Sequence, residues 1–165
     1  LRGRKLLAAT AESCTGGWIA QAITMVPGSS GWFDRGFVTY TNDAKRDMLG
    51  VKAETLQKSG AVSEETVKEM AAGALARSTA QVAVAVSGIA GPGGGTSKKP
   101  VGTVMLAWAS KDGDCVSQRR RFNGDRDSIR RQSVVVALEG LLALIERRGQ
   151  YVRGDAGEVA APLFR

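Results

Sequence analysis

The pattern of apolar and polar segments predicts an α/β protein, a three-layer α/β/α sandwich built on a mixed, mostly parallel sheet. Short apolar runs alternate with amphipathic helical segments over most of the chain, which is typical of strands joined by covering helices. A hairpin pattern followed by one long helical segment adds antiparallel strands near the end. With 165 residues, the chain is long enough for one domain with a buried core.

Strands are predicted where apolar or β-branched runs are bounded by turn residues. The segments are 5–12, 32–40, 82–86, 103–109 and 115–122. The third run alternates Val and Ala without a polar residue, so we expect both of its faces to be covered. The Lys-Asp-Gly-Asp sequence at 111–114 has turn chemistry and joins the last two strands.

Helices are predicted where a capping residue precedes apolar residues at helical spacing. The segments are 15–25, 44–49, 53–59, 63–78 and 126–148. Residues 1–148 are therefore predicted to form the domain. Residues 149–165 combine Gly, Pro and mixed charge without a period, which predicts a mobile tail.

Composition narrows the classes of function. The 23 Lys and Arg exceed the 16 Asp and Glu, and this net charge of +7 favours anionic partners. Aromatic residues are few and not interleaved with basic ones, so nucleic acid is an unlikely partner. No apolar run has the length of a membrane span, and no signal peptide opens the chain. The two cysteines are too few for a disulfide framework or a zinc site, so we expect a cytoplasmic protein.

Histidine is absent from the sequence. Its absence excludes Ser-His-Asp and Cys-His mechanisms and removes the commonest metal ligand. A base for nucleophilic catalysis must therefore be Lys, Tyr, Asp or Glu.

The segment Ala-Glu-Ser-Cys-Thr-Gly-Gly at 11–17 joins the first predicted strand to the first predicted helix. It would place two potential nucleophiles, Ser13 and Cys14, beside the positive end of the helix dipole. The backbone N–H groups of Gly16 and Gly17 would stand free to bind an anion or an oxyanion. The alternative is a structural turn, with a Ser/Thr helix cap and a small buried cysteine.

Ligands of such folds bind at the carboxyl ends of parallel strands. The loops there are 13–17, 39–45 and 87–96, so we expect them to converge on one crevice. Lys45 could take the Ser13 proton if a nonpolar crevice and neighbouring cationic side chains lowered its pKa. Tyr40 could relay a proton or orient either group. Taken singly, Lys45 could instead be a solvated helix lysine and Tyr40 a half-buried strand tyrosine.

The glycine-rich segment 87–95 could cradle a phosphate through free backbone N–H groups. It matches neither the Walker loop nor G-x-G-x-x-G, and a flexible connection is the alternative. Lys98, Lys99, Arg126 and the arginines at 119–121 supply positive charge, which is more often solvated surface.

Six motifs occur in order and make the pattern more specific. They are Ala11-Glu12-Ser13-Cys14-Thr15-Gly16-Gly17, then Gly36-Phe37-Val38-Thr39-Tyr40 with Asn42 and Lys45, then Gly60-Ala61-Val62-Ser63, then Ser87-Gly88-Ile89-Ala90-Gly91-Pro92, then Lys99-Pro100-Val101-Gly102-Thr103-Val104, then Gly124-Asp125-Arg126. Over about residues 5–148 this series closely resembles the C-terminal domain family of the competence/damage-inducible protein CinA.

The resemblance implies a five-stranded mixed sheet, a homo-oligomer of two or more copies, and hydrolysis without a metal or other cofactor. Stand-alone members are nicotinamide mononucleotide deamidases, which produce nicotinate mononucleotide and ammonia in pyridine nucleotide salvage. By motif, Ser13 is the nucleophile, Lys45 the base and Tyr40 the tyrosine of the site. The substrate-binding residues expected in these loops are Cys14, Thr15, Gly16, Gly17, Thr39, Asn42, Ser87, Gly88, Gly91 and Arg126. Ser87 replaces a threonine that many members have.

The expected function is therefore a Ser-Lys amidohydrolase acting on a small nucleotide. The alternative from another class is a non-catalytic nucleotide-binding module, which would bind the ligand without releasing ammonia. Nucleic-acid binding rests on the positive charge alone and would give salt-dependent retention of DNA. The nucleotide-hydrolysing N-terminal domain of full-length CinA proteins is not among these residues, so we do not expect that second activity.

Overall fold

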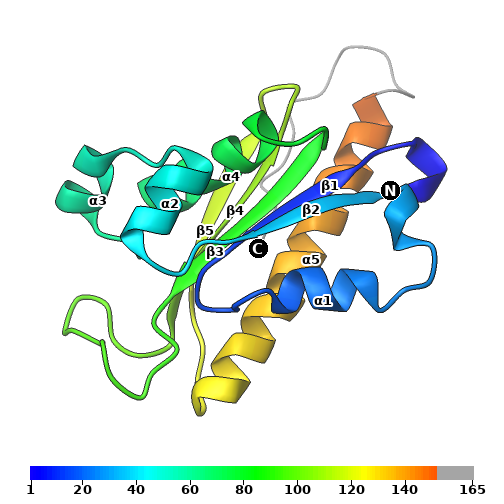
Figure 1. Cartoon of the computed structure of the whole chain (residues 1–165). Helices are drawn as coiled ribbons and strands as arrows, with labels where there is room; N and C mark the ends of the chain where they lie inside the picture. Colours follow the sequence, from blue (N-terminus) through cyan, green and yellow to red (C-terminus); the bar gives the residue numbers. More distant parts are fainter. Residues whose placement is uncertain (152–165) are drawn as a thin grey trace.

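The computed structural model describes residues 1–151, which form one five-stranded sheet with helices on both faces (Figure 1). The strands are β1 (Ala8–Glu12), β2 (Phe33–Val38), β3 (Val82–Gly88), β4 (Thr103–Ser110) and β5 (Cys115–Arg121). The α-helices are α1 (Trp18–Thr24), α2 (Asn42–Leu49), α3 (Ala53–Ser59), α4 (Glu64–Ala76) and α5 (Arg126–Tyr151). The short 3-10 segments η1 (Arg2–Arg4) and η2 (Ser29–Gly31) precede β1 and β2.

The strand order is β2-β1-β3-β4-β5. β1 is parallel to both of its neighbours, whereas β4 is antiparallel to β3 and to β5. All of these strands except β4 therefore run in the same direction, which confirms the mixed, mostly parallel sheet. The carboxyl ends of the first three strands meet at one edge, where Glu12 is paired with Val38 on one side and Val86 on the other.

Two helical layers complete the sandwich (Figure 1): α1 and α5 cover one face, and α2, α3 and α4 cover the other. β3 contributes its valines to the core under α1 and α5 and its alanines to the core under α4, so both of its faces are covered as predicted. The small alanine side chains leave room for a closely packed helical layer. None of the helices within residues 1–151 is long and apolar enough to cross a membrane.

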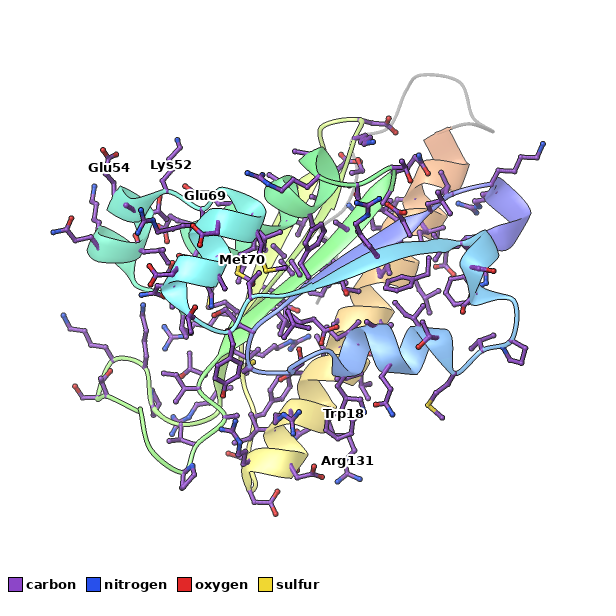
Figure 2. All side chains as sticks on the ribbon, in the orientation of Figure 1. Trp18, Lys52, Glu54, Glu69, Met70 and Arg131 are labelled. Atoms are coloured by element: carbon purple, nitrogen blue, oxygen red, sulfur yellow. The ribbon has the colours of Figure 1, made fainter. Side chains whose placement is uncertain are left out.

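Caps determine where the covering helices begin. The Thr41 hydroxyl accepts a hydrogen bond from the Ala44 N–H, 3.1 Å away, at the start of α2. Glu69 of α4 accepts hydrogen bonds from the Thr55 hydroxyl and the Lys52 N–H, and thereby fastens α3 to α4 (Figure 2). Both α2 and α3 contact α4, which packs on the sheet.

Several ends differ from the predicted ones. The helix expected from residue 15 begins at Trp18, because Gly16 and Gly17 have φ angles of 62° and 96° and form a left-handed turn. β1 begins at Ala8, since the chain before it forms η1 and a turn rather than a strand. β2 ends at Val38, so the two residues after it belong to a loop. α5 extends past the predicted boundary at 148, and the tail residues 152–165 lie outside the described residues.

Candidate active site

Ser13 lies at the carboxyl end of β1, on the face covered by α2 and α4. Ala9 and Ala11 contribute to the core on that face, and side chains alternate along a strand, so Ser13 follows them. The Ser13 N–H donates to the carbonyl of Val86, 3.0 Å away, which continues the pairing with β3. Ser13 is 8% exposed and is therefore a buried residue.

Lys45 reaches Ser13 from α2. Its Nζ lies 3.0 Å from Ser13 Oγ, 2.8 Å from the carbonyl oxygen of Thr39 and 3.3 Å from that of Tyr40. All three oxygens are uncharged, and the lysine is 1% exposed. An ammonium would donate to all three; a neutral amine would donate to the two carbonyls and accept the Ser13 proton with its lone pair. The geometry therefore suits a serine paired with its base.

Burial lowers the pKa of Lys45 from its ordinary value of 10.5, because desolvation penalises the charged form. The sequence suggested that neighbouring cationic side chains would contribute, but burial is the cause. A Cys14 thiolate would raise the pKa of Lys45. Burial, however, raises the pKa of Cys14 to about 11, so that thiol is uncharged near neutral pH. Burial thus makes Lys45 easier to deprotonate than an exposed lysine.

Glu12 precedes Ser13 in the chain, and its side chain lies on the opposite face of the sheet. Its carboxylate is fully buried and accepts four hydrogen bonds. They come from the Thr15 hydroxyl at 2.6 Å and from the N–H groups of Gly17, Ile19 and Ala20 at 3.0, 3.0 and 2.8 Å. The carboxylate therefore caps α1, whose own N-cap residue supplies no side chain.

The prediction that the Gly16 and Gly17 amides are free was wrong. The Gly17 N–H donates to Glu12, and the Gly16 N–H donates to the Ser13 carbonyl at 3.0 Å. A carboxylate from the preceding strand satisfies the start of the helix, so these donors are occupied. Among the amides of residues 13–17, those of Cys14 and Thr15 donate to no backbone carbonyl or side-chain oxygen of the described part of the chain.

Arg130 of α5 holds the same turn from the other side. Its Nε donates to the Cys14 carbonyl at 3.1 Å and its Nη2 to the Thr15 carbonyl at 3.0 Å. The guanidinium also lies over the ring of Trp18, 5.2 Å from the ring centre. Figure 2 shows Trp18 projecting from α1 toward the first turns of α5.

A second cross-link joins the β2 loop to the glycine-rich loop. Arg126 donates to the carbonyl of Gly91 at 2.8 Å and to the hydroxyl of Tyr40 at 3.0 Å. Tyr40 is 58% exposed, and its hydroxyl faces Arg126 while its carbonyl contacts Lys45. The three loops expected to converge are therefore connected: 13–17 to 39–45 through Lys45, and 39–45 to 87–96 through Arg126.

The other predicted substrate-binding residues have varied surroundings. The Cys14 side chain packs in the core under α1 and α5, on the face opposite Ser13. The Ser87 hydroxyl donates to the carbonyl of Ala61, 2.8 Å away, and Gly88 ends β3. Asn42 is exposed at the start of α2, whereas the Thr39 hydroxyl is buried without a hydrogen-bond partner.

The basic residues near the glycine loop do not join the Ser13–Lys45 pair. Lys99 donates to the carbonyl of Ser59, and Arg119 donates to the carbonyl of Lys98. They tie the loop to α3 and β5. Within residues 1–151, no group of three or more Cys, Asp or Glu side chains is arranged to hold a metal ion.

Sequence reasoning missed Glu12 and Arg130. A carboxylate at the end of a buried strand was one signal, because such a group needs several donors. The other signal was the spacing of Arg126 and Arg130, which are four residues apart and so share a face of the last helix.

Known proteins resemble the chain over most of its length. The family model of the CinA C-terminal domain matches residues 1–145. The nicotinamide-nucleotide amidohydrolase PncC of Escherichia coli (strain K12) is 55% identical over 141 residues, 86% of each chain. The protein of that name from Pseudomonas putida is 60% identical over 136 residues, 82% of this chain and 84% of its own.

The fold agrees with these matches. The crystal structure of the competence/damage inducible protein CihA from Agrobacterium tumefaciens superposes with a TM-score of 0.86 at 56% identity, covering 87% of this chain and 88% of that one. The sequence matches and the structural match point to the same family, and each covers most of the chain. The chain therefore belongs to the CinA C-terminal domain family.

Proposed function

We propose that the protein hydrolyses the carboxamide of nicotinamide mononucleotide, giving nicotinate mononucleotide and ammonia, through a Ser13–Lys45 pair. Identity of 55–60% to amidohydrolases over most of both chains makes the chain an amidohydrolase. The observation that carries the mechanism is the buried Lys45 amine, 3.0 Å from Ser13 Oγ. The reaction would return the pyridine nucleotide to salvage.

In the first half of the reaction, Ser13 Oγ attacks the amide carbon while the neutral Lys45 amine takes the hydroxyl proton. The tetrahedral intermediate then breaks its C–N bond. Lys45 returns the proton to the departing nitrogen, so ammonia leaves and an acyl ester remains on Ser13. In the second half, Lys45 takes a proton from water, the hydroxide attacks the ester, and Ser13 leaves with that proton.

The negative charge on the intermediate's oxygen needs fixed donors. The amide of the residue after the nucleophile fills this role in other serine hydrolases with a strand-turn-helix nucleophile. Here the Cys14 amide interacts with its own thiol, whereas the Thr15 amide has no acceptor among the described residues and is the donor of the turn that stays unused. One such donor contributes about 3 kcal/mol to the transition state.

Arg126 is the proposed ligand for the 5′-phosphate. Its guanidinium joins two of the converging loops, at Gly91 and Tyr40, and both of its partners there are neutral oxygens. A phosphate would replace them with charge-assisted hydrogen bonds, which are stronger. Tyr40, released from Arg126, would then be free to position the substrate.

The test is ammonia release from nicotinamide mononucleotide by the wild type and Ser13→Ala. Release by the wild type alone supports the covalent mechanism, because the variant lacks the attacking oxygen and should lose about 10³-fold or more in kcat. Full turnover by Ser13→Ala would overturn it. A folded wild type that binds the nucleotide without releasing ammonia would instead be a binding module. The homo-oligomer and the cytoplasmic location stay predictions.

A further inference from the structure

We propose that Arg130 is a positioning residue for the oxyanion site: it orients the Cys14–Thr15 peptide so that the Thr15 N–H faces the reacting carbonyl oxygen. The inference rests on the proposed function and adds a residue outside the predicted site. It starts from the two hydrogen bonds that Arg130 makes to the turn, at 3.1 Å and 3.0 Å.

The two bonds fix the direction of two successive peptide groups. In a trans peptide the C=O and the following N–H point in opposite directions. Arg130 approaches from α5, on the face of the sheet opposite Ser13 and Lys45, and draws the Cys14 carbonyl toward itself. The Thr15 N–H of the same peptide group must then point away from α5, toward the face on which the Ser13 hydroxyl lies.

The next peptide group supports this orientation. Arg130 binds the Thr15 carbonyl, and the N–H of that group belongs to Gly16. The Gly16 N–H points back to the Ser13 backbone, because it donates to the Ser13 carbonyl at 3.0 Å. In the Cys14–Thr15 peptide group, too, Arg130 binds the carbonyl and the N–H points the other way. The Thr15 N–H has no acceptor among the described residues, so it can donate a hydrogen bond to a ligand.

The turn depends on such an external restraint. Gly16 and Gly17 both have left-handed φ angles, and glycine leaves many other conformations open to them. Glu12 anchors the helical end of the turn through its backbone N–H groups, but it does not bind the Cys14 or Thr15 carbonyls. A guanidinium can hold both carbonyls at once because its donors form a rigid planar fork, whereas a lysine ammonium is a single point.

The guanidinium of Arg130 is supported on one side and lies next to a surface cavity. The Trp18 ring supports one face of the guanidinium. A surface cavity of about 450 Å³ adjoins it and is lined in part by Thr15, Gly16 and Asp127. A small cation from solution could therefore reach the space that a shortened side chain would leave.

The experiment compares Arg130→Ala with the matched control Arg131→Ala, from the neighbouring exposed position of α5. We expect Arg130→Ala to lower kcat by about 10²-fold, since a misplacement of about 1 Å at the reacting centre can cost that much. KM should change little, because the donor acts on the transition state rather than on the bound substrate. Guanidinium at millimolar concentration should restore part of the lost kcat in this variant and leave the wild type unchanged.

Each other outcome overturns the inference. An unchanged kcat in folded Arg130→Ala removes the positioning role, and a rise in KM alone makes Arg130 a substrate-binding residue. Failure of guanidinium to restore kcat would indicate loss of structure rather than loss of orientation. If Arg130→Ala does not fold, Arg130→Lys replaces it, with the same expected loss of kcat. If neither the wild type nor Arg131→Ala releases ammonia from the nucleotide, the proposed function itself is refuted, and this inference with it.

Discussion

Lys45 and Glu12 are both buried, ionisable side chains that flank Ser13 from opposite faces of the sheet. Glu12 accepts four hydrogen bonds, three of them from the start of α1, where the helix dipole also favours a negative charge. Lys45 meets a hydroxyl and two carbonyls and has no carboxylate partner among them. Both residues are almost completely buried, but hydrogen-bond donors surround the Glu12 carboxylate, whereas burial lowers the pKa of Lys45.

Glu12 and Lys45 therefore differ in kind: the contacts of Glu12 stabilise the start of α1, whereas Lys45 contacts the hydroxyl of Ser13. A buried carboxylate that is fully hydrogen-bonded behaves as a fixed part of the fold, whereas a buried amine with uncharged partners gives up its proton more readily than an exposed lysine does. Glu12 and Ser13 are neighbours in the chain, and alternation along β1 sends them to opposite faces, so Glu12 meets α1 while Ser13 meets Lys45. Changing each group should therefore produce different kinds of defect.

The largest expected effect is on catalysis through Lys45. Lys45→Arg puts a permanent cation in place of the proposed neutral amine and so removes the base, because a guanidinium does not deprotonate in proteins. We expect kcat to fall by about 10³-fold or more, as for other residues of a catalytic unit. Ammonia release under saturating nucleotide measures it. Lys58→Arg, on exposed α3, is the control, and activity of Lys45→Arg near that of the control would exclude Lys45 as the base.

The next effect is on stability through Glu12. Glu12→Gln replaces an oxygen by an NH₂ group that cannot accept from the N–H groups of α1, so buried donors lose their partner. We expect the free energy of unfolding to fall by about 2–4 kcal/mol.

Denaturant unfolding measures this change, with Glu54→Gln as control because Glu54 projects into solvent from α3 (Figure 2). The control should stay within about 0.5 kcal/mol of the wild type. If Glu12→Gln were as stable as the control, the cap formed by this carboxylate would not contribute to the fold.

The smallest effect is the pH dependence that Lys45 gives to stability. The pKa of Lys45 is lowered in the folded protein and lies near 10.5 in the unfolded chain. Between these two values the unfolded chain holds a proton that the folded protein does not, so stability rises with pH by up to about 1.4 kcal/mol per pH unit.

Unfolding of the wild type and Lys45→Met across this pH range measures the contribution. The free energy of unfolding of the wild type, minus that of the variant, should rise as the pH approaches 10.5 and then level off. Parallel curves for the two proteins would mean that Lys45 is not perturbed by burial. The kcat/KM of the wild type should rise with pH through the same lowered pKa.

Local patterns predicted most of the strands and helices, and the motifs predicted which loops meet at the carboxyl edge of the sheet. Alternating Val and Ala at 82–86 predicted a strand covered on both faces, and the structure places its two residue types in two separate cores. The motifs placed Ser13 and Lys45 in converging loops, and the two side chains are in contact. The start of α1 was misplaced, and the Gly16 and Gly17 amides were wrongly expected to be free, because a carboxylate outside the helix supplies its cap.

The sequence by itself determined the order of strands and helices along the chain, the absence of a histidine base and the set of loops at the carboxyl edge of the sheet. These follow from side-chain type, spacing along one segment and connection rules, which are all local or topological. Only the tertiary structure decided which backbone amides of the turn at 13–17 have no acceptor, and that burial is what lowers the pKa of Lys45. It also decided that Arg130 donates a hydrogen bond to Thr15, 115 residues away in the sequence. Burial and hydrogen-bond partners depend on which distant segments meet, and no single stretch of chain encodes them.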